Sequence, residues 1–277
     1  MMTTDTATAP RLTLEVAICT MGADGIAGVS RMVAAPQRGV SYMISWQNSD
    51  GCRVPPELDG RTDVRIVKCQ RRGLSANRNN ALDHARGDII LIADDDLEYR
   101  DGAFEAIRRV FEENPQLEYA AFRHDGPGER HYPEQETRLE LPLPRNYFQT
   151  SFEVALRRES RAGCLRYCEQ FGLGSGRYIC GEEELLLRKA IRRGVECRFF
   201  PVTIVTHPGV STGFRQSERD AVNRVRGVLT VVDHPFSWPL RAVVRGWRSG
   251  GCMGALRSLG GAVEACVLPH VRRYLGS

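Results

Sequence analysis

The chain has 277 residues, of which 42% are hydrophobic and 26% are charged, as expected for one or two globular domains rather than a disordered or fibrous protein. It has no apolar run of roughly 18 residues and no signal-peptide pattern, so we expect a cytoplasmic protein and not an integral membrane protein. The net charge of +4 is too small to indicate nucleic-acid binding, and the spacing of the nine cysteines does not favour a zinc site.

Residues 11–232 are predicted to form one α/β domain, and residues 1–10 a disordered N-terminus. The first half alternates apolar runs with a helical pattern. Strands are predicted at residues 12–20 (LTLEVAICT), 40–46 (VSYMISW), 64–69 (VRIVKC) and 88–93 (DIILIA), with a helix at 74–85. Strand–helix–strand units at this spacing indicate a doubly wound sheet with right-handed crossovers.

The second half of the domain contains longer connections between its predicted elements. These elements are a helix at 103–113, a strand at 119–122, a helix at 182–193 and a strand at 197–206. Residues 125–145 are rich in proline and charge and are predicted to be a loop close to the active site. His124, His131 and His234 are interpreted as ordinary surface or loop residues.

Residues 233–277 form a tail that differs in composition from the domain. Between residues 241 and 273 it contains six arginines and a single acidic residue, Glu264, interleaved with aliphatic and tryptophan side chains. Such a basic amphipathic segment can lie as a helix on an anionic membrane surface, or it can form a helix pair packed on the domain. The sequence leaves both interpretations open.

The strongest functional signal is an acidic trio, Asp94, Asp95 and Asp96, which directly follows the predicted strand 88–93. Three adjacent carboxylates repel one another unless a cation is present. Ligands bind at the carboxyl ends of strands in open α/β sheets, and carboxylates suit the Mg²⁺ or Mn²⁺ ions that bridge proteins to phosphates. The trio therefore predicts a metal site, with an acidic helix start as the structural alternative.

A second signal lies upstream, where Gly73 and Leu74 open the predicted helix. Ser75 is a candidate cap that would leave backbone N–H groups free to face an anion. Arg78 lies one turn further on, where its donor fork can reach a phosphate. The combination with an acidic trio on the next strand is more specific than either signal alone.

Residues 73–96 (GLSANRNNALDHARGDIILIADDD) resemble the core signature of family 2 glycosyltransferases, in which a Gly–Ser–Arg–Asn helix precedes Gly-Asp, an apolar strand and a DxD motif. The resemblance extends over residues 12–213. It includes residues 181–185 (GEEEL), which are similar to the Gly-Glu-Asp segment of the family, and the HPGVSTG segment that begins at His207. It implies the GT-A fold, a Rossmann-like doubly wound mixed sheet, here with a C-terminal helical extension.

The resemblance also implies roles for individual residues. The end of the first strand and the turn at residues 48–50 would bind the nucleobase, and the helix arginine would help to hold the nucleotide. The outer aspartates of the trio, Asp94 and Asp96, would contact the ribose and a Mn²⁺ or Mg²⁺ ion on the diphosphate. The residues implied to bind the nucleotide sugar are Thr20, Asp50, Arg78, Asp94 and Asp95.

Glu183 stands where the family has the aspartate that acts as general base for inverting transfer. Glutamate can accept the same proton, but its extra methylene leaves the choice between Glu183 and Glu182 open. The structural alternative is that residues 182–184 only favour the positive end of their helix. Three roles stay open for His207: it can be a third metal ligand, it can orient a phosphate, or it can be a hydrogen-bonded histidine at the end of a strand.

The expected activity is metal-dependent, inverting transfer of a sugar from a UDP- or GDP-sugar to a hydroxyl of a glycan or lipid-linked acceptor, as in polysaccharide biosynthesis. A sugar nucleotidyltransferase is the first alternative, since it shares a related sheet and metal-binding aspartates. Its glycine-rich loop after the first strand would here be residues 21–31 (MGADGIAGVSR), which contain only Arg31 as a cation. A catalytically silent glycan-binding protein on the same fold is the second, and the intact acidic clusters count against it.

Overall fold

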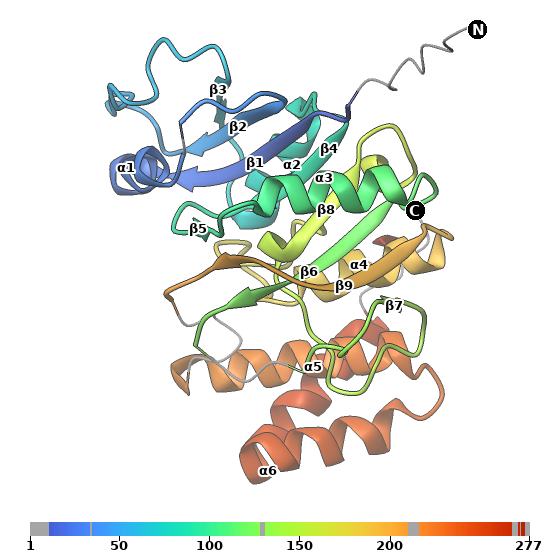
Figure 1. The fold of residues 1–277 in the computed structure, drawn as a ribbon. Coiled ribbons are helices and arrows are strands. Elements are labelled where there is room, and N and C mark those ends of the chain that lie inside the picture. Colours follow the sequence, from blue (N-terminus) through green and yellow to red (C-terminus); the bar gives the residue numbers. More distant parts are fainter. Residues whose placement is uncertain are drawn as a thin grey trace, which may run out of the picture.

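The computed structural model describes residues 11–33, 35–127, 131–209, 216–267, 271, 273 and 274 (Figure 1). The predicted disordered N-terminus, residues 210–213 of the HPGVSTG segment, and residues 268–270, 272 and 275–277 of the tail lie outside the described residues.

The described strands form one nine-stranded sheet in the order β3-β2-β1-β4-β8-β6-β9-β5, with β7 paired to β9. The strands are β1 (Leu14–Met21), β2 (Val40–Gln47), β3 (Val64–Cys69), β4 (Ile89–Ala93), β5 (Glu98–Tyr99), β6 (Tyr119–Asp125), β7 (Thr137–Arg138), β8 (Val154–Arg157) and β9 (Cys197–Thr206). The first four are mutually parallel, whereas β8 runs antiparallel to both β4 and β6. This mixed α/β sheet with a C-terminal helical region confirms the predicted fold class.

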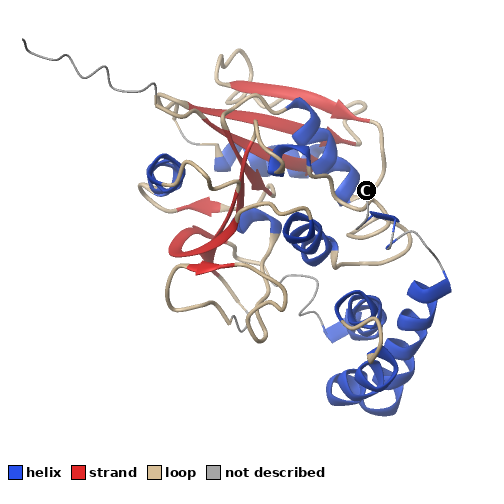
Figure 2. Ribbon diagram, turned by 90° about the vertical axis from the view of Figure 1, so that its right-hand side faces the viewer, coloured by secondary structure: helices blue, strands red, loops and turns tan. Residues whose placement is uncertain are grey.

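Helices cover both faces of the sheet, and two further helices form a separate layer at one end (Figures 1 and 2). The helices are α1 (Gly22–Met32), α2 (Leu74–His84), α3 (Ala103–Glu113), α4 (Glu182–Arg192), α5 (Arg219–Asp233) and α6 (Trp238–Val267). The strands and helices predicted from apolar periodicity are all present. The predicted loop at 125–145 also contains the short strand β7, and β5, β8, α1 and α5 were not predicted.

Alternation along the strands divides the core between the two faces of the sheet. Val16 and Ile18 of β1 pack in the cluster that contains side chains of α1 and α3. Ala17 and Cys19, on the opposite face, pack in the cluster that contains side chains of α2 and α4. Both clusters are almost fully buried, so the strand ends that carry the polar residues are fixed on both sides.

Helix α1 occupies the segment that was interpreted as a glycine-rich loop, so that interpretation is wrong. Gly25 and Gly28 of this helix allow close packing against neighbouring residues and do not form a turn. A Cβ atom on Gly25 would lie 2.3 Å from Thr20 Oγ1 and 2.6 Å from Asp95 Oδ2, and one on Gly28 would lie 2.6 Å from the Asp95 carbonyl oxygen. The helix can therefore lie directly against the acidic trio only because these two positions have no side chain.

The tail forms a helical hairpin packed on α5. Non-helical backbone at Gly250 and Gly251 divides α6 into two arms, and small residues bring the helices together. A Cβ on Gly227 of α5 would lie 1.8 Å from the Ser258 carbonyl oxygen, and one on Gly246 would lie 2.3 Å from that of Gly254. The tail thus has the helix-pair arrangement that was one of the two open interpretations. None of the described helices has the length and apolar character needed to cross a bilayer.

Candidate active site

A cleft with a volume of about 1060 Å³ lies at the carboxyl edge of β1, β2 and β4 and extends to α5 and α6. The predicted site residues that line it are Thr20, Arg78, Asp94, Asp95, Asp96, Glu182, Glu183 and His207. Asp50 is not among the lining residues, because its exposed carboxylate points to Lys68, with Oδ1 3.8 Å from Nζ. The turn at 48–50 contributes Asn48 to the cleft instead.

Pairing between β1 and β4 sets the position of the acidic trio. Ile18 is opposite Ala93, the last residue of β4, so the residues that follow emerge beside Cys19 and Thr20. Asp95 accepts a hydrogen bond from Thr20 Oγ1 at 2.7 Å, and burial raises the pKa of this carboxyl group. The hydroxyl that the resemblance assigns to the nucleobase therefore holds the middle aspartate in the structure.

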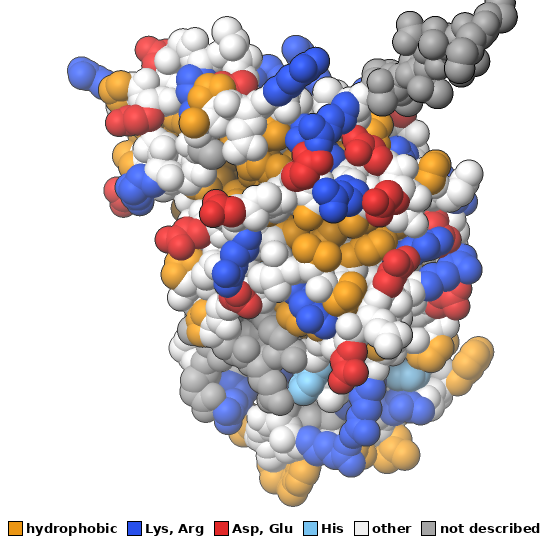
Figure 3. Space-filling view, viewed as in Figure 1, with side chains coloured by type: hydrophobic (Ala, Val, Ile, Leu, Met, Phe, Trp, Pro, Cys, Tyr) orange, Lys and Arg blue, Asp and Glu red, His pale blue; other side chains and the backbone are white. Residues whose placement is uncertain are grey.

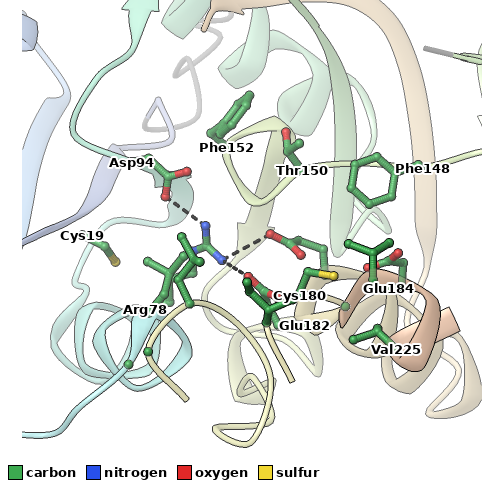
Figure 4. Close-up of a pocket in the computed structure, with 18 of the residues that line it drawn as sticks. Cys19, Arg78, Asp94, Phe148, Thr150, Phe152, Cys180, Glu182, Glu184 and Val225 are labelled. Atoms are coloured by element: carbon green, nitrogen blue, oxygen red, sulfur yellow. Dashed lines mark hydrogen bonds and ion pairs between the residues drawn. The ribbon is translucent and has the colours of Figure 1, made fainter. Parts of the chain in front are cut away.

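Arg78 connects the acidic trio to the first turn of α4 (Figure 4). Its side chain is 3% exposed; Nη2 donates to Asp94 Oδ1 at 2.9 Å, and Nη1 donates to Glu182 Oε1 at 3.0 Å and to Glu183 Oε1 at 3.2 Å. The Tyr167 ring lies against the guanidinium carbon, with 5.5 Å between that carbon and the ring centroid. One buried cation thus compensates three carboxylates from two distant parts of the chain.

The three glutamates at the start of α4 occupy different environments. Glu182 is 5% exposed, and burial followed by repulsion from Glu183 raises its pKa well above the usual range. Glu183 is 12% exposed, and its Oε1 also accepts a hydrogen bond from Ser151 Oγ at 3.1 Å. Glu184 lies further from Arg78 (Figure 4), and burial raises its pKa to about 7. Glu183 combines fixed orientation with access to the cleft.

His207 contacts the last aspartate of the trio from the end of β9. Its Nε2 lies 3.3 Å from Asp96 Oδ2, and the imidazole stacks on Phe152 with ring centroids 5.0 Å apart. The hydrogen bond to Asp96 raises the pKa of His207, and the same bond lowers the pKa of Asp96. His207 thereby fixes the orientation of the Asp96 carboxylate.

The donor set suits a divalent cation, although the structure contains no assembled ligand group. Across the described part of the chain, no three His, Cys, Asp or Glu side chains converge as metal ligands. Asp94 is paired through Oδ1 and Asp96 through Oδ2, so each carboxylate keeps a second oxygen with no partner among the described residues. Nδ1 of His207 is also buried without a partner. Free carboxylate oxygens at one cleft fit the preference of Mg²⁺ and Mn²⁺.

The start of α2 differs from its predicted cap. Gly73, with φ of 95°, is the capping residue, and Ser75 Oγ donates instead to the Phe171 carbonyl at 2.6 Å. The Leu74 N–H donates to the Leu173 carbonyl at 2.8 Å, so the loop around Leu173 covers the helix start. The predicted Ser75 cap is therefore wrong, and the Leu74 N–H is not free to face an anion, although Gly73 and Leu74 do line the cleft.

A segment without a recognised motif, residues 150–152, supplies further side chains to the site. Thr150 and Phe152 line the cleft, and Ser151 holds Glu183. The spacing of Thr150 and Glu153 is the one signal that marks the segment, because it matches a capping box. In the structure, Thr150 Oγ1 donates to Glu153 Oε2 at 3.0 Å.

The three histidines interpreted as surface or loop residues differ in position. His124 is buried in β6, where Nδ1 lies 2.8 Å from Glu153 Oε1, so the prediction for this residue is wrong. His131 is an exposed loop residue, as predicted, and it lines the cleft from the proline-rich segment, which thus borders the candidate site. His234 lies half-buried at the end of α5.

The opposite end of the cleft is basic and is built by α4, α5 and α6. Arg188 makes two hydrogen bonds to Asp233, at 2.6 and 2.7 Å. Three more arginines line this end, namely Arg226, Arg245 and Arg248. None of these cationic side chains appears in the predicted site; Arg226, Arg245 and Arg248 lie beyond residue 213, where the family resemblance ends.

Several solved structures share this fold. S. aureus TarS 1-349 matches with a TM-score of 0.58 at 10% identity, covering 91% of each chain. Its complex with UDP-GlcNAc matches with a TM-score of 0.57 at 12% identity, covering 96% of this chain and 80% of that chain. Mannosyltransferase PcManGT from Pyrobaculum calidifontis, in complex with GDP-Man and Mn²⁺, matches with a TM-score of 0.55 at 14% identity, covering 96% and 86%.

The fold is the one that glycosyltransferases of the GT-A type have. Residues 57–170, which include Arg78 and the acidic trio, match the model of glycosyl transferase family 2. This match agrees with the resemblance of residues 73–96. No curated protein sequence matches the chain.

Proposed function

We propose that this glycosyltransferase is metal-dependent and inverting, and that it transfers a sugar from a UDP- or GDP-sugar to a hydroxyl of a glycan or lipid-linked acceptor in polysaccharide biosynthesis. The observation that carries the proposal is the position of Arg78, which joins Asp94 to Glu182 and Glu183 within one cleft. The Asp94 carboxylate, which can approach a diphosphate, and the Glu183 carboxylate, which can accept a proton, thereby bind the same guanidinium group from two sides.

On the donor side, Asp94 and Asp96 would hold the divalent ion through their unpaired oxygens, with His207 fixing Asp96. When bound, the ion supplies Lewis-acid neutralisation of the charge that develops on the leaving diphosphate. The nucleotide would lie along the strand ends, where Thr20 and Asn48 line the cleft. Solved structures with this fold contain UDP-GlcNAc or GDP-Man, which supports a nucleotide-sugar donor.

On the acceptor side, Glu183 is the proposed general base and Glu182 the buried residue that helps to fix Arg78. The acceptor hydroxyl oxygen forms the new bond to the anomeric carbon while its proton passes to the Glu183 carboxylate. The electron pair of the cleaved bond leaves with the nucleoside diphosphate. A single base opposite the leaving group gives direct displacement with inversion. Arg78 and Ser151 would hold Glu183 Oε1, which leaves Oε2 to accept the proton.

Thermal shift with nucleotides tests the donor part of the proposal. We expect saturating UDP or GDP with Mn²⁺ to raise the melting temperature by about 5 °C or more, because ligand at about 100 times its Kd contributes about 2.7 kcal/mol. This shift should nearly vanish in Asp96→Asn and persist in Asp50→Asn, since Asp50 lies outside the cleft lining. An unchanged shift in Asp96→Asn, or a shift that is the same without Mn²⁺, would contradict the metal assignment.

The tail supports a further part of the proposal, contact with an anionic membrane surface on the cytoplasmic side. Both arms of α6 expose a stripe of large apolar side chains, which we call the α6 ridge: Leu240, Val243, Val244, Trp247, Met253, Leu256, Val263 and Val267. Exposed arginines lie beside it, and Figure 3 shows apolar and basic side chains together at this end of the molecule. Apolar side chains flanked by arginines suit the interface of an anionic bilayer.

Vesicle sedimentation tests this contact. We expect the protein to bind vesicles of phosphatidylcholine with phosphatidylglycerol, and Leu240→Ser with Trp247→Ser to weaken binding at least about tenfold, because each apolar side chain that enters the bilayer contributes about 1 kcal/mol or more. The control Val54→Ser with Leu141→Ser changes exposed apolar residues outside the ridge. Equal binding by both variants, or a lipid-free dimer that only the ridge variant dissociates, would overturn the membrane proposal.

A further inference from the structure

Three arginines at the α5–α6 end of the cleft, Arg226, Arg245 and Arg248, form no ion pair with a carboxylate of the described residues, and two of them are held by neutral side chains. Thr230 Oγ1 accepts a hydrogen bond from Arg245 Nη1 at 3.2 Å, and Asn223 Oδ1 accepts one from Arg226 Nη1 at 3.5 Å. Arg248 has no hydrogen bond or ion pair to any described residue. By contrast, Arg71, Arg78 and Arg188, which also line the cleft, each pair with carboxylates.

The three side chains belong to one polar surface. Asn223 Oδ1 also accepts a hydrogen bond from Ser249, the residue after Arg248. Thr230 Oγ1, which receives the Arg245 bond, donates in turn to the Arg226 carbonyl at 2.7 Å. Thr230 thus contacts both Arg245 and Arg226, Asn223 contacts Arg226 and the residue that follows Arg248, and all three arginines line the cleft.

The surrounding charges leave this end of the cleft positive. Asp233 is already compensated by the two hydrogen bonds from Arg188. Glu184 has a pKa raised to about 7 by burial, so it is only half-ionised at neutral pH. Burial lowers the pKa of Arg245; the nearby Asp233 opposes this shift, and Arg241 and Arg188 add to it. Guanidinium groups that line a cleft without a paired carboxylate suit an anion with several acceptor oxygens.

We propose that Arg226, Arg245 and Arg248 bind a phosphate group carried by the acceptor substrate. The site lies at the end of the cleft beyond the proposed base and away from the strand ends that would take the donor nucleotide. Arg245 and Arg248 lie on the same helix as the α6 ridge, so an acceptor phosphate attached to a lipid could reach the site from a membrane surface. The inference rests on the proposed function, because it specifies the acceptor of the same transfer.

Calorimetric titration with decyl phosphate tests this site directly, with the protein saturated by UDP and Mg²⁺ so that the donor end is filled. Replacing both α6 arginines, Arg245→Gln with Arg248→Gln, is expected to weaken decyl phosphate binding at least about tenfold, because charge-assisted hydrogen bonds to phosphate are lost. The matched control is Arg241→Gln with Arg257→Gln, which removes the same charge from the same helix outside the cleft lining. This control should bind within about twofold of the unmodified protein.

Two additional titrations define what the site recognises. Decyl maltoside, with the same chain and no charge, should bind at least about tenfold more weakly than decyl phosphate. Competition by excess inorganic phosphate would show that the phosphate group alone is recognised, and lack of competition would show that the lipid chain is required. Equal decyl phosphate binding by both double variants, or equal binding of the two decyl compounds, would overturn the inference. Failure of UDP and GDP to bind at all would instead contradict the proposed function.

Discussion

Glu183→Gln is expected to lower kcat for sugar transfer by about 10²- to 10⁴-fold, the usual contribution of a general base. The amide has the same shape as the carboxylate, and its oxygen can still accept the hydrogen bonds from Arg78 and Ser151. It cannot take the proton of the acceptor hydroxyl. The Kd for the donor nucleotide should therefore stay within about twofold, so that the loss appears in the chemical step.

Glu182→Gln distinguishes the two candidate bases, because it makes the same chemical change one residue earlier. Glu182 is the more buried residue, and its Oε2 is enclosed without a hydrogen-bond partner. Single-turnover rates of both variants with bound donor separate the assignments. A larger loss of rate in Glu182→Gln than in Glu183→Gln would make Glu182 the base. If both variants retain more than about a tenth of the rate, the general base does not lie at the start of α4.

Arg78→Gln is expected to destabilise the fold by about 3–5 kcal/mol, because it leaves several buried carboxylates without their shared cation. The pKa of Glu182, which burial and repulsion from Glu183 already raise, would then rise further because the opposing effect of Arg78 is lost. A carboxyl group whose folded pKa is raised loses stability as pH rises through the interval between its unfolded and folded pKa. The deficit measured by urea unfolding should therefore be larger at about pH 8 than at about pH 5.

Arg71→Gln is the matched control for this experiment. Arg71 also pairs with two carboxylates, those of Asp83 and Glu169, but its side chain is 45% exposed. The loss there should stay below about 1 kcal/mol and show little dependence on pH. The double variant Arg78→Gln with Glu182→Gln should recover part of the lost stability. An Arg78→Gln protein as stable as the Arg71→Gln protein would contradict the role of Arg78 as the shared counter-ion.

The fold was predictable where hydrophobic patterning is strong. The runs that became β1, β2 and β4 are apolar because both faces of these strands are covered by helices. Helix α1 was missed because Gly25 and Gly28 lower helix propensity, and their reason lies in tertiary contacts with Thr20 and Asp95. The four-residue strand β8 was missed because so short a strand carries little periodic signal.

The candidate site was predictable only in part, because some of its contacts join residues far apart in the sequence. The acidic trio follows directly from local sequence, since a buried strand ends at Ala93. The ion pairs of Arg78 with Glu182 and Glu183 join residues 104 and 105 positions apart, which no local pattern reports. Asp50 was assigned to the nucleotide-binding site by resemblance to a turn of the family. In the structure its side chain points toward Lys68, an orientation that the sequence does not predict.

The close contact between Gly227 of α5 and the residues of α6 has a consequence for where this enzyme can be shortened. Composition changes at Asp233, yet a protein ending there would expose the apolar surface of Val225 and Val228 that α6 now covers. It would also lose Arg245 and Arg248, which form one side of the cleft. The last helix is therefore an integral part of the catalytic body, and truncation before it should give an insoluble product rather than a smaller active enzyme.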